Sequence, residues 1–200
     1  MRQWFSALIM PVVVTAALSA CHPAAVPVAL DSGPSGTRED AISRPIVAAG
    51  PFVDKRGQGP TYLGTIRGAF GEPVTRLYTI APVSGLVREA FANGLRARGL
   101  LADATEAPYT LSGEIAAFDT NQYIRGEAEA NVALTLTETS TGRILALWPV
   151  QVRERQGTVP VTGAPAAYGL PEPLPKVASD ALRRLVDDAL DSPKFQEAVR

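Results

Sequence analysis

The sequence predicts an α+β domain in which an antiparallel sheet of about four strands carries two amphipathic helices on one face, in the order β-α-β-β-β-α. Two patterns predict this class. Apolar and polar residues alternate over residues 109–154, as in strands with one buried face, and apolar residues recur at helical spacing over 82–98 and 178–189. With 46% hydrophobic and 20% charged side chains, the chain can build one core, so residues 45–200 are expected to form a single domain.

The first strand is expected over residues 45–53, a short apolar run that stops at Asp54, Lys55 and Arg56. We interpret these three residues as a solvated turn in which Asp54 and Arg56 pair locally. Residues 57–79 hold five glycines among scattered apolar residues, so no period identifies an element there, although a short hairpin fits.

Two amphipathic helices are expected from apolar stripes. The first covers residues 82–98 and ends before Gly99, which suits a C-cap. Its stripe comprises Leu86, Val87, Ala90, Phe91 and Leu95. The last helix follows a proline-rich loop, and its stripe covers residues 178–189. Ser192 and Pro193 then resemble the N-cap and first-turn proline of a short terminal helix.

Three long strands are expected between the helices, over residues 109–119, 127–138 and 143–154. One face of this sheet is apolar and the other is polar. Phe118, Leu145 and Leu147 fall on the face opposite the core, where exposed apolar side chains are candidate contacts for a partner or an acyl chain. A slightly different register, or cover from residues 57–79, would bury them instead.

The N-terminus has the pattern of a secretion signal. Arg2 supplies a positive charge, and residues 4–20 form an uncharged, mainly apolar run that ends in Ser19 and Ala20. Residues 1–20 are therefore expected to be a signal peptide. No other stretch approaches the roughly 20 apolar residues that a spanning helix needs, so the mature chain is expected to have no transmembrane helix.

Leu18, Ser19, Ala20 and Cys21 resemble the lipobox of bacterial lipoproteins. The resemblance implies that the Cys21 thiol receives a diacylglycerol, that cleavage makes Cys21 the new N-terminus, and that acyl chains such as palmitate hold the chain in a membrane. The alternative is an unmodified cysteine after an ordinary signal peptide. Because His22 stands where an aspartate would favour the inner membrane, the resemblance implies a periplasm-facing outer-membrane lipoprotein if the organism is Gram-negative.

Residues 21–44 are expected to be the lipidated N-terminus and a flexible tether. From His22 to Arg44 the chain is rich in proline, alanine, glycine and serine and shows no apolar period. A flexible coil of this length spans roughly 25–30 Å. The domain would then be free to reorient above the membrane.

The chain also resembles the YajG-type lipoprotein family and, more loosely, the auxiliary lipoproteins of ABC-type transport systems. Besides the lipobox, the resemblance is carried by Val53-Asp54-Lys55-Arg56, Tyr62-Leu63-Gly64, the helix Val87 to Gly99 and Leu111-Ser112-Gly113-Glu114-Ile115. It covers roughly residues 45–155. It implies an accessory role in the cell envelope and no catalytic residues.

Composition excludes several classes of site. The chain has one cysteine and one histidine, the adjacent Cys21 and His22, which exclude an internal disulfide and leave a His/Cys metal site without ligands. Lysine and arginine number 19 against 20 acidic residues, so nothing attracts nucleic acid. Glu127 and Glu129 lie on a wet strand face, where solvation keeps carboxylates ordinary and speaks against a glycoside-hydrolysing pair.

These observations predict a non-enzymatic, membrane-anchored lipoprotein that binds or scaffolds another envelope protein and needs no cofactor or metal. The alternative is an accessory lipoprotein that contacts lipid or lipopolysaccharide during transport. A periplasmic hydrolase is the weakest reading because no usable histidine or cysteine is present. A continuous apolar groove between sheet and helices would favour transport, whereas a flat polar surface would favour a protein partner.

Overall fold

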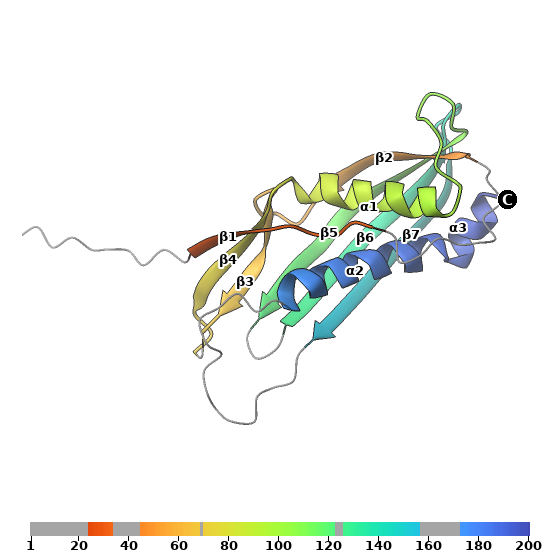
Figure 1. Cartoon of the computed structure of the whole chain (residues 1–200). Coiled ribbons are helices and arrows are strands. Elements are labelled where there is room, and N and C mark those ends of the chain that lie inside the picture. Colours follow the sequence, from red (N-terminus) through yellow and green to blue (C-terminus); the bar gives the residue numbers. More distant parts are fainter. Residues whose placement is uncertain (1–23, 34–44, 69, 123–125, 157–172) are drawn as a thin grey trace, which may run out of the picture.

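The computed structural model describes residues 24–33, 45–68, 70–122, 126–156 and 173–200. In these residues a seven-stranded mixed sheet carries helices on one face (Figure 1). The strands are β1 (Ala24–Val28), β2 (Val47–Asp54), β3 (Tyr62–Arg67), β4 (Pro73–Thr79), β5 (Tyr109–Gln122), β6 (Gly126–Glu138) and β7 (Ile144–Gln156). The helices are α1 (Val83–Ala97), α2 (Pro173–Leu190) and α3 (Pro193–Ala198).

The expected antiparallel sheet of about four strands with two helices is wrong. The sheet runs β1-β4-β3-β5-β6-β7, and β2 also pairs with β5. Three of these pairings are parallel: β1 with β4, β2 with β5, and β3 with β5. The parallel pairs join strands that are distant along the chain, which alternation within one strand cannot indicate. β1, β3 and β4 are short and contain proline or glycine, so they lack the alternation that identifies β5 to β7.

Strand β5 organises the sheet because three of the described strands, β2, β3 and β6, pair with it. One edge pairs with β6 along nearly the whole strand. The other edge is divided: β2 pairs with its first half, up to Ile115, and β3 pairs with its end, from Thr120 to Gln122. Where the two neighbours meet, β5 contains a bulge between Ile115 and Ala117.

The bulge reverses which residues of β5 face the core. Before it, Leu111 and Ile115 are fully buried, and after it Phe118 and Thr120 are buried instead. One extra residue in a strand shifts every later side chain to the other face of the sheet. The alternation of β5 therefore cannot be extrapolated across residue 116.

The core lies between the sheet and the two long helices. Phe52 of β2 stacks on Phe91 of α1 with ring centroids 5.0 Å apart. Trp148 of β7 packs near Phe195 of α3, with centroids 6.1 Å apart. Ser192 accepts a hydrogen bond from the Phe195 backbone N–H, which confirms the N-cap expected for the short terminal helix.

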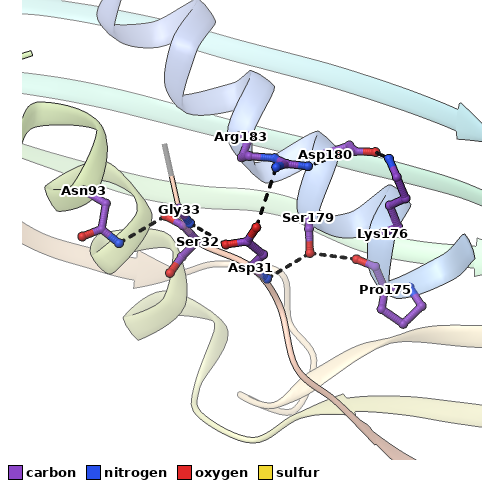
Figure 2. A network of polar contacts seen from close by, with 9 residues as sticks. All are labelled: Asp31, Ser32, Gly33, Asn93, Pro175, Lys176, Ser179, Asp180 and Arg183. Atoms are coloured by element: carbon purple, nitrogen blue, oxygen red, sulfur yellow. Dashed lines mark hydrogen bonds and ion pairs between the residues drawn. The ribbon is translucent and has the colours of Figure 1, made fainter. Parts of the chain in front are cut away.

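Residues 24–33, which lie inside the expected flexible tether, are part of the fold. β1 adds a parallel strand to β4, and the chain then crosses the helical face between α1 and α2 (Figures 1 and 2). Asp31 donates its backbone N–H to Ser179 Oγ at 3.0 Å, and Asn93 Nδ2 donates to the Ser32 carbonyl at 3.2 Å (Figure 2). The tether prediction is wrong for these residues because β1 pairs with β4, Asp31 and Ser32 bond to the helices, and Val26, Val28 and Leu30 pack against the core.

Gly64 allows β3 to approach β5 closely. A Cβ atom at this position would lie 1.7 Å from the Thr120 carbonyl oxygen. We expect Gly64→Ala to lower the free energy of unfolding by about 3 kcal/mol, because the backbone of β5 cannot give way as a flexible side chain would. Urea denaturation followed by circular dichroism measures the change.

Gly85→Ala is the matched control. Nothing lies within 4 Å of a Cβ atom there, and Gly85 is in α1. Alanine favours a helix over glycine by up to about 1 kcal/mol, so this variant should be at least as stable as the wild type. Equal stability of the two variants would contradict the close approach of β3 and β5.

Candidate functional site

The face of the sheet turned away from the helices is the candidate functional surface, and we call it the open face. No helix covers it in the part of the chain that the structure describes (Figure 1). One register row crosses five strands on this face. From β4 to β7 it consists of Arg76, Thr65, Asn121, Glu127 and Arg155.

Ion pairs fix the end of the open face formed by β6 and β7. Arg153 lies 2.8 Å from Glu129 and 3.3 Å from Glu127, and Arg155 lies 3.1 Å from Glu127. The hydrogen bond from Arg153 lowers the pKa of Glu129. These pairs are solvent-exposed, so each adds little to stability, but together they present a patterned surface of both charge signs.

An open hollow of about 470 Å³ lies on the same face over β3 and β4. The rings of Tyr62 and Tyr78 meet edge to face in its lining, with centroids 5.9 Å apart. Tyr62 Oη lies 2.6 Å from Thr65 Oγ1. Arg67 and Arg76 also line the hollow, and neither forms an ion pair with any described carboxylate. Aromatic rings beside unpaired guanidinium groups can bind an acidic or planar group of a partner.

Arg56 holds the junction of β2, β3 and β5 beneath this surface. Its side chain is 1% exposed, and its guanidinium pairs with Asp54 at 2.8 Å. Nη1 donates to the carbonyl oxygens of Tyr62 and Phe118, each at 2.8 Å. The local pairing expected from the sequence is present, but the solvated turn is not, because the guanidinium is buried by the strands that it joins.

Asp119 lies beside this junction, on the open face. Burial raises its pKa, and the nearby Arg56 charge opposes that rise. The Gln58 side chain forms a hydrogen bond with it, which also acts to lower the pKa. Because the Asp119 carboxylate is already half-buried, a partner could contact it at little further desolvation cost.

The structure separates the residues predicted as a partner-binding cluster. Phe118 is 1% exposed and belongs to the core, so its expected exposure is wrong, and the β5 bulge is the reason. Leu145 is half-buried against the core, because the β6–β7 register shifts at this point: Leu136 pairs with Ala146 and Thr137 with Ile144, which leaves Leu145 without a partner in the ladder. Leu147 is 61% exposed and remains a candidate contact. Cys21, the predicted lipidation site, lies outside the described residues.

Leu145 and Leu147 line a second open hollow, of about 420 Å³, between β7 and α3. Lys194 and Glu197 of α3 share the lining, so the hollow is of mixed character. The described residues contain no cluster of histidine, cysteine, aspartate and glutamate that could hold a metal ion.

Sequence reasoning missed the tyrosine and arginine hollow. Tyr62, Arg67, Arg76 and Tyr78 lie in or beside the glycine-rich stretch for which no period could be identified. Tyr62 and Arg67 are the two ends of β3, and Arg76 and Tyr78 lie two residues apart on β4. Only the antiparallel register of β3 and β4 brings them to one surface.

Comparison with known proteins identifies the fold. Protein XCC0632 from Xanthomonas campestris, described with family model DUF330, superposes with a TM-score of 0.60 at 11% identity, over 88% of this chain and 99% of that chain. An uncharacterized protein superposes with a TM-score of 0.51 at 9% identity, over 88% and 97%. At these identities the chain shares a fold with both proteins, and no more is shown.

Lipoprotein GNA1162 from Neisseria meningitidis gives a TM-score of 0.32 at 9% identity, over 74% of this chain and 100% of that chain. A TM-score of this size does not establish a common fold. No protein-family model matches the sequence, and no curated protein matches it. The resemblance to the YajG-type family therefore stays a prediction. Within the described residues, no helix has the length and apolar character needed to cross a membrane.

Replacing Arg56 tests the junction. Arg56→Met leaves the Asp54 carboxylate and two strand carbonyls without their donor, so we expect the free energy of unfolding to fall by about 3–5 kcal/mol. Lys55→Met, at the exposed neighbouring residue, should change it by about 0.5 kcal/mol or less. Urea denaturation of both variants is the measurement, and a similar small effect in both would show that the junction does not depend on Arg56.

The opposite pKa shifts of Asp119 and Asp103 predict opposite effects of amide substitution. The pKa of Asp119 is raised by burial, so the native state holds its proton to higher pH than the unfolded chain, and stability declines as pH rises through that range. Asp119→Asn should therefore be more stable than the wild type at pH 7. The gain should vanish below about pH 3, where the carboxyl is protonated in both states.

Asp103 is the control of opposite sign. Hydrogen bonds from the Thr105 backbone and hydroxyl lower its pKa, so its carboxylate stabilises the fold above the unfolded pKa, and this stability is lost as pH falls through the folded pKa. Asp103→Asn should be less stable than the wild type at pH 7. Thermal unfolding of both variants across pH 3–7 would contradict the assignment if the two changes had the same sign.

Proposed function

We propose that the protein is a non-enzymatic, lipid-anchored module of the bacterial cell envelope that binds another envelope protein through the open face of its sheet. The observation that carries this proposal is the open face itself. It spans the strands from β4 to β7, presents exposed side chains of both charges, and has no helix over it among the described residues. Such a surface suits a protein partner with complementary charges.

The polar character of the open face favours a protein partner over an acyl chain. Its register row has an arginine at each end, and the glutamates of β6 form ion pairs with the arginines of β7. The hollow over β3 and β4 is lined mainly by polar groups and tyrosine rings. Lipid transport would require an apolar path, so the accessory transport role is the less supported of the two functions.

The proposed anchor is Cys21. The motif Leu18-Ser19-Ala20-Cys21 supports lipidation of its thiol, and an acylated N-terminus with two or more chains gives stable membrane attachment. With His22 after the cysteine, we place the protein in the outer membrane, facing the periplasm, if the organism is Gram-negative. The chain then acts as a membrane-bound partner for a periplasmic or envelope protein.

Site-specific photo-crosslinking in intact cells tests the binding surface. A photo-reactive amino acid at Gln151 places the probe on the exposed face of β7, and the same amino acid at Asp188 places it on the exposed side of α2. We expect one protein adduct to recur from Gln151 and none from Asp188. Equal adducts from both positions, or none from Gln151, would contradict the open face as the binding surface.

The Cys21→Ala variant tests the anchor separately. We expect the wild type in the membrane fraction with an incorporated fatty-acid label, and the variant without the label. Loss of the Gln151 adduct in Cys21→Ala cells would show that attachment is needed for binding. A wild-type chain without fatty acid would overturn the anchor while leaving the crosslinking result to decide the binding surface.

A further inference from the structure

Strand β1 starts three residues after Cys21 and fixes where the proposed anchor leaves the domain. Ala24 is paired with Thr75 of β4, and β1 runs parallel to β4 as far as Val28 and Thr79. Both strands therefore begin at the same end of the sheet, where β3 ends (Figure 1). Three residues of fully extended chain span about 10 Å, so Cys21 cannot lie far from this end.

The chain after β1 prevents the strand from acting as a free linker. Asp31 and Ser32 bond to α2 and α1 respectively, and Asp31 forms an ion pair with Arg183 at 3.7 Å (Figure 2). The strand itself is thus held by β4, and the residues that follow it are held by both helices. An anchored Cys21 would hold this end of the domain against the membrane.

The turn between β3 and β4 is at this same end, and it carries an exposed aromatic residue. Phe70 is 96% exposed. The turn is closed by hydrogen bonds from the Gly68 N–H to the Glu72 carbonyl at 2.8 Å and from Arg67 Nη1 to the Gly71 carbonyl at 3.0 Å. Phe70 is therefore presented on a hydrogen-bonded turn and not buried anywhere in the described fold.

Two arginines flank this turn, which itself contains Glu72, whose carboxylate accepts a hydrogen bond from the Phe70 backbone N–H at 3.1 Å. Arg67 ends β3, and Arg76 lies on β4 next to Thr75, the residue paired with the first residue of β1. Neither arginine forms an ion pair with a described carboxylate, as noted for the hollow that they line. In a bilayer the lipid phosphates lie outside the acyl chains. A phenylalanine in the turn, with arginines on the strands that adjoin it, can therefore contact both layers at once.

We propose that the β3–β4 turn rests on the membrane that holds Cys21, with Phe70 entering the boundary between headgroups and acyl chains and Arg67 and Arg76 facing lipid phosphates. The inference rests on the proposed lipidation of Cys21. Because anchor and turn are at one end of the sheet, the strands rise from the membrane and the open face stands upright beside it, accessible to a partner.

Tryptophan quenching in vesicles tests the contact. The full mature, lipidated chain has one tryptophan, Trp148, which is 3% exposed and therefore reports little contact with lipid. Phe70→Trp adds a probe at the turn. Ile80→Trp is the matched control, because Ile80 is an apolar residue, 79% exposed, beyond the opposite end of β4.

The protein is reconstituted in vesicles of phosphatidylethanolamine and phosphatidylglycerol with brominated acyl chains, and flotation measures binding. We expect every chain to float, the added emission of Phe70→Trp to be lost to bromine quenching, and that of Ile80→Trp to persist. Flotation with equal emission from both probes would overturn the membrane contact of the turn and leave the anchor intact. Failure of the wild type to float would overturn the anchor, and the inference with it.

Discussion

The Arg56 guanidinium supplies hydrogen bonds at the junction of β2, β3 and β5, where it joins the three strands. β2 and β3 share a single edge of β5, end to end, and where they meet the carbonyls of Tyr62 and Phe118 accept hydrogen bonds from Arg56 Nη1. A buried carbonyl without a donor is costly, and Arg56 satisfies both while Asp54 balances its charge. The Arg56 bond holds the Asp54 pKa below its ordinary value, so this junction is strongest with the carboxylate ionised.

Regular periods made much of the domain predictable. α1 and α2 follow from their apolar stripes, and β5, β6 and β7 follow from alternation, because each element buries one face against the same core. The parallel partners of β4 and β5 could not be predicted, since they are chosen by tertiary packing. β1 is only five residues long and contains Pro27, and besides its apolar contacts through Val26 and Val28 it is held by pairing with β4 and by polar contacts of the residues after it, which a hydropathy pattern does not show.

On the candidate surface, too, some features could be predicted from the sequence and others could not. Glu127 and Glu129 were expected on the wet face of β6 and lie there, paired with arginines of β7 whose contacts depend on the β6–β7 register. Phe118 was misplaced by a single inserted residue, and the hollow of Tyr62 and Tyr78 depends on a hairpin without a period. Side-chain type was thus predictable along each strand, whereas side-chain neighbours required the register.

The parallel pairing of β1 with β4 also has a mechanical consequence for a chain attached at its N-terminus. A pull on Ala24, directed away from the domain, acts along the axis of β1, and the hydrogen bonds to β4 lie across that axis. They are then loaded in shear, all at once, instead of being peeled apart one after another. A lateral force from the membrane or from a bound partner is distributed over the whole strand. The contacts of Asp31 with α2 bear the part of that force that passes beyond β1.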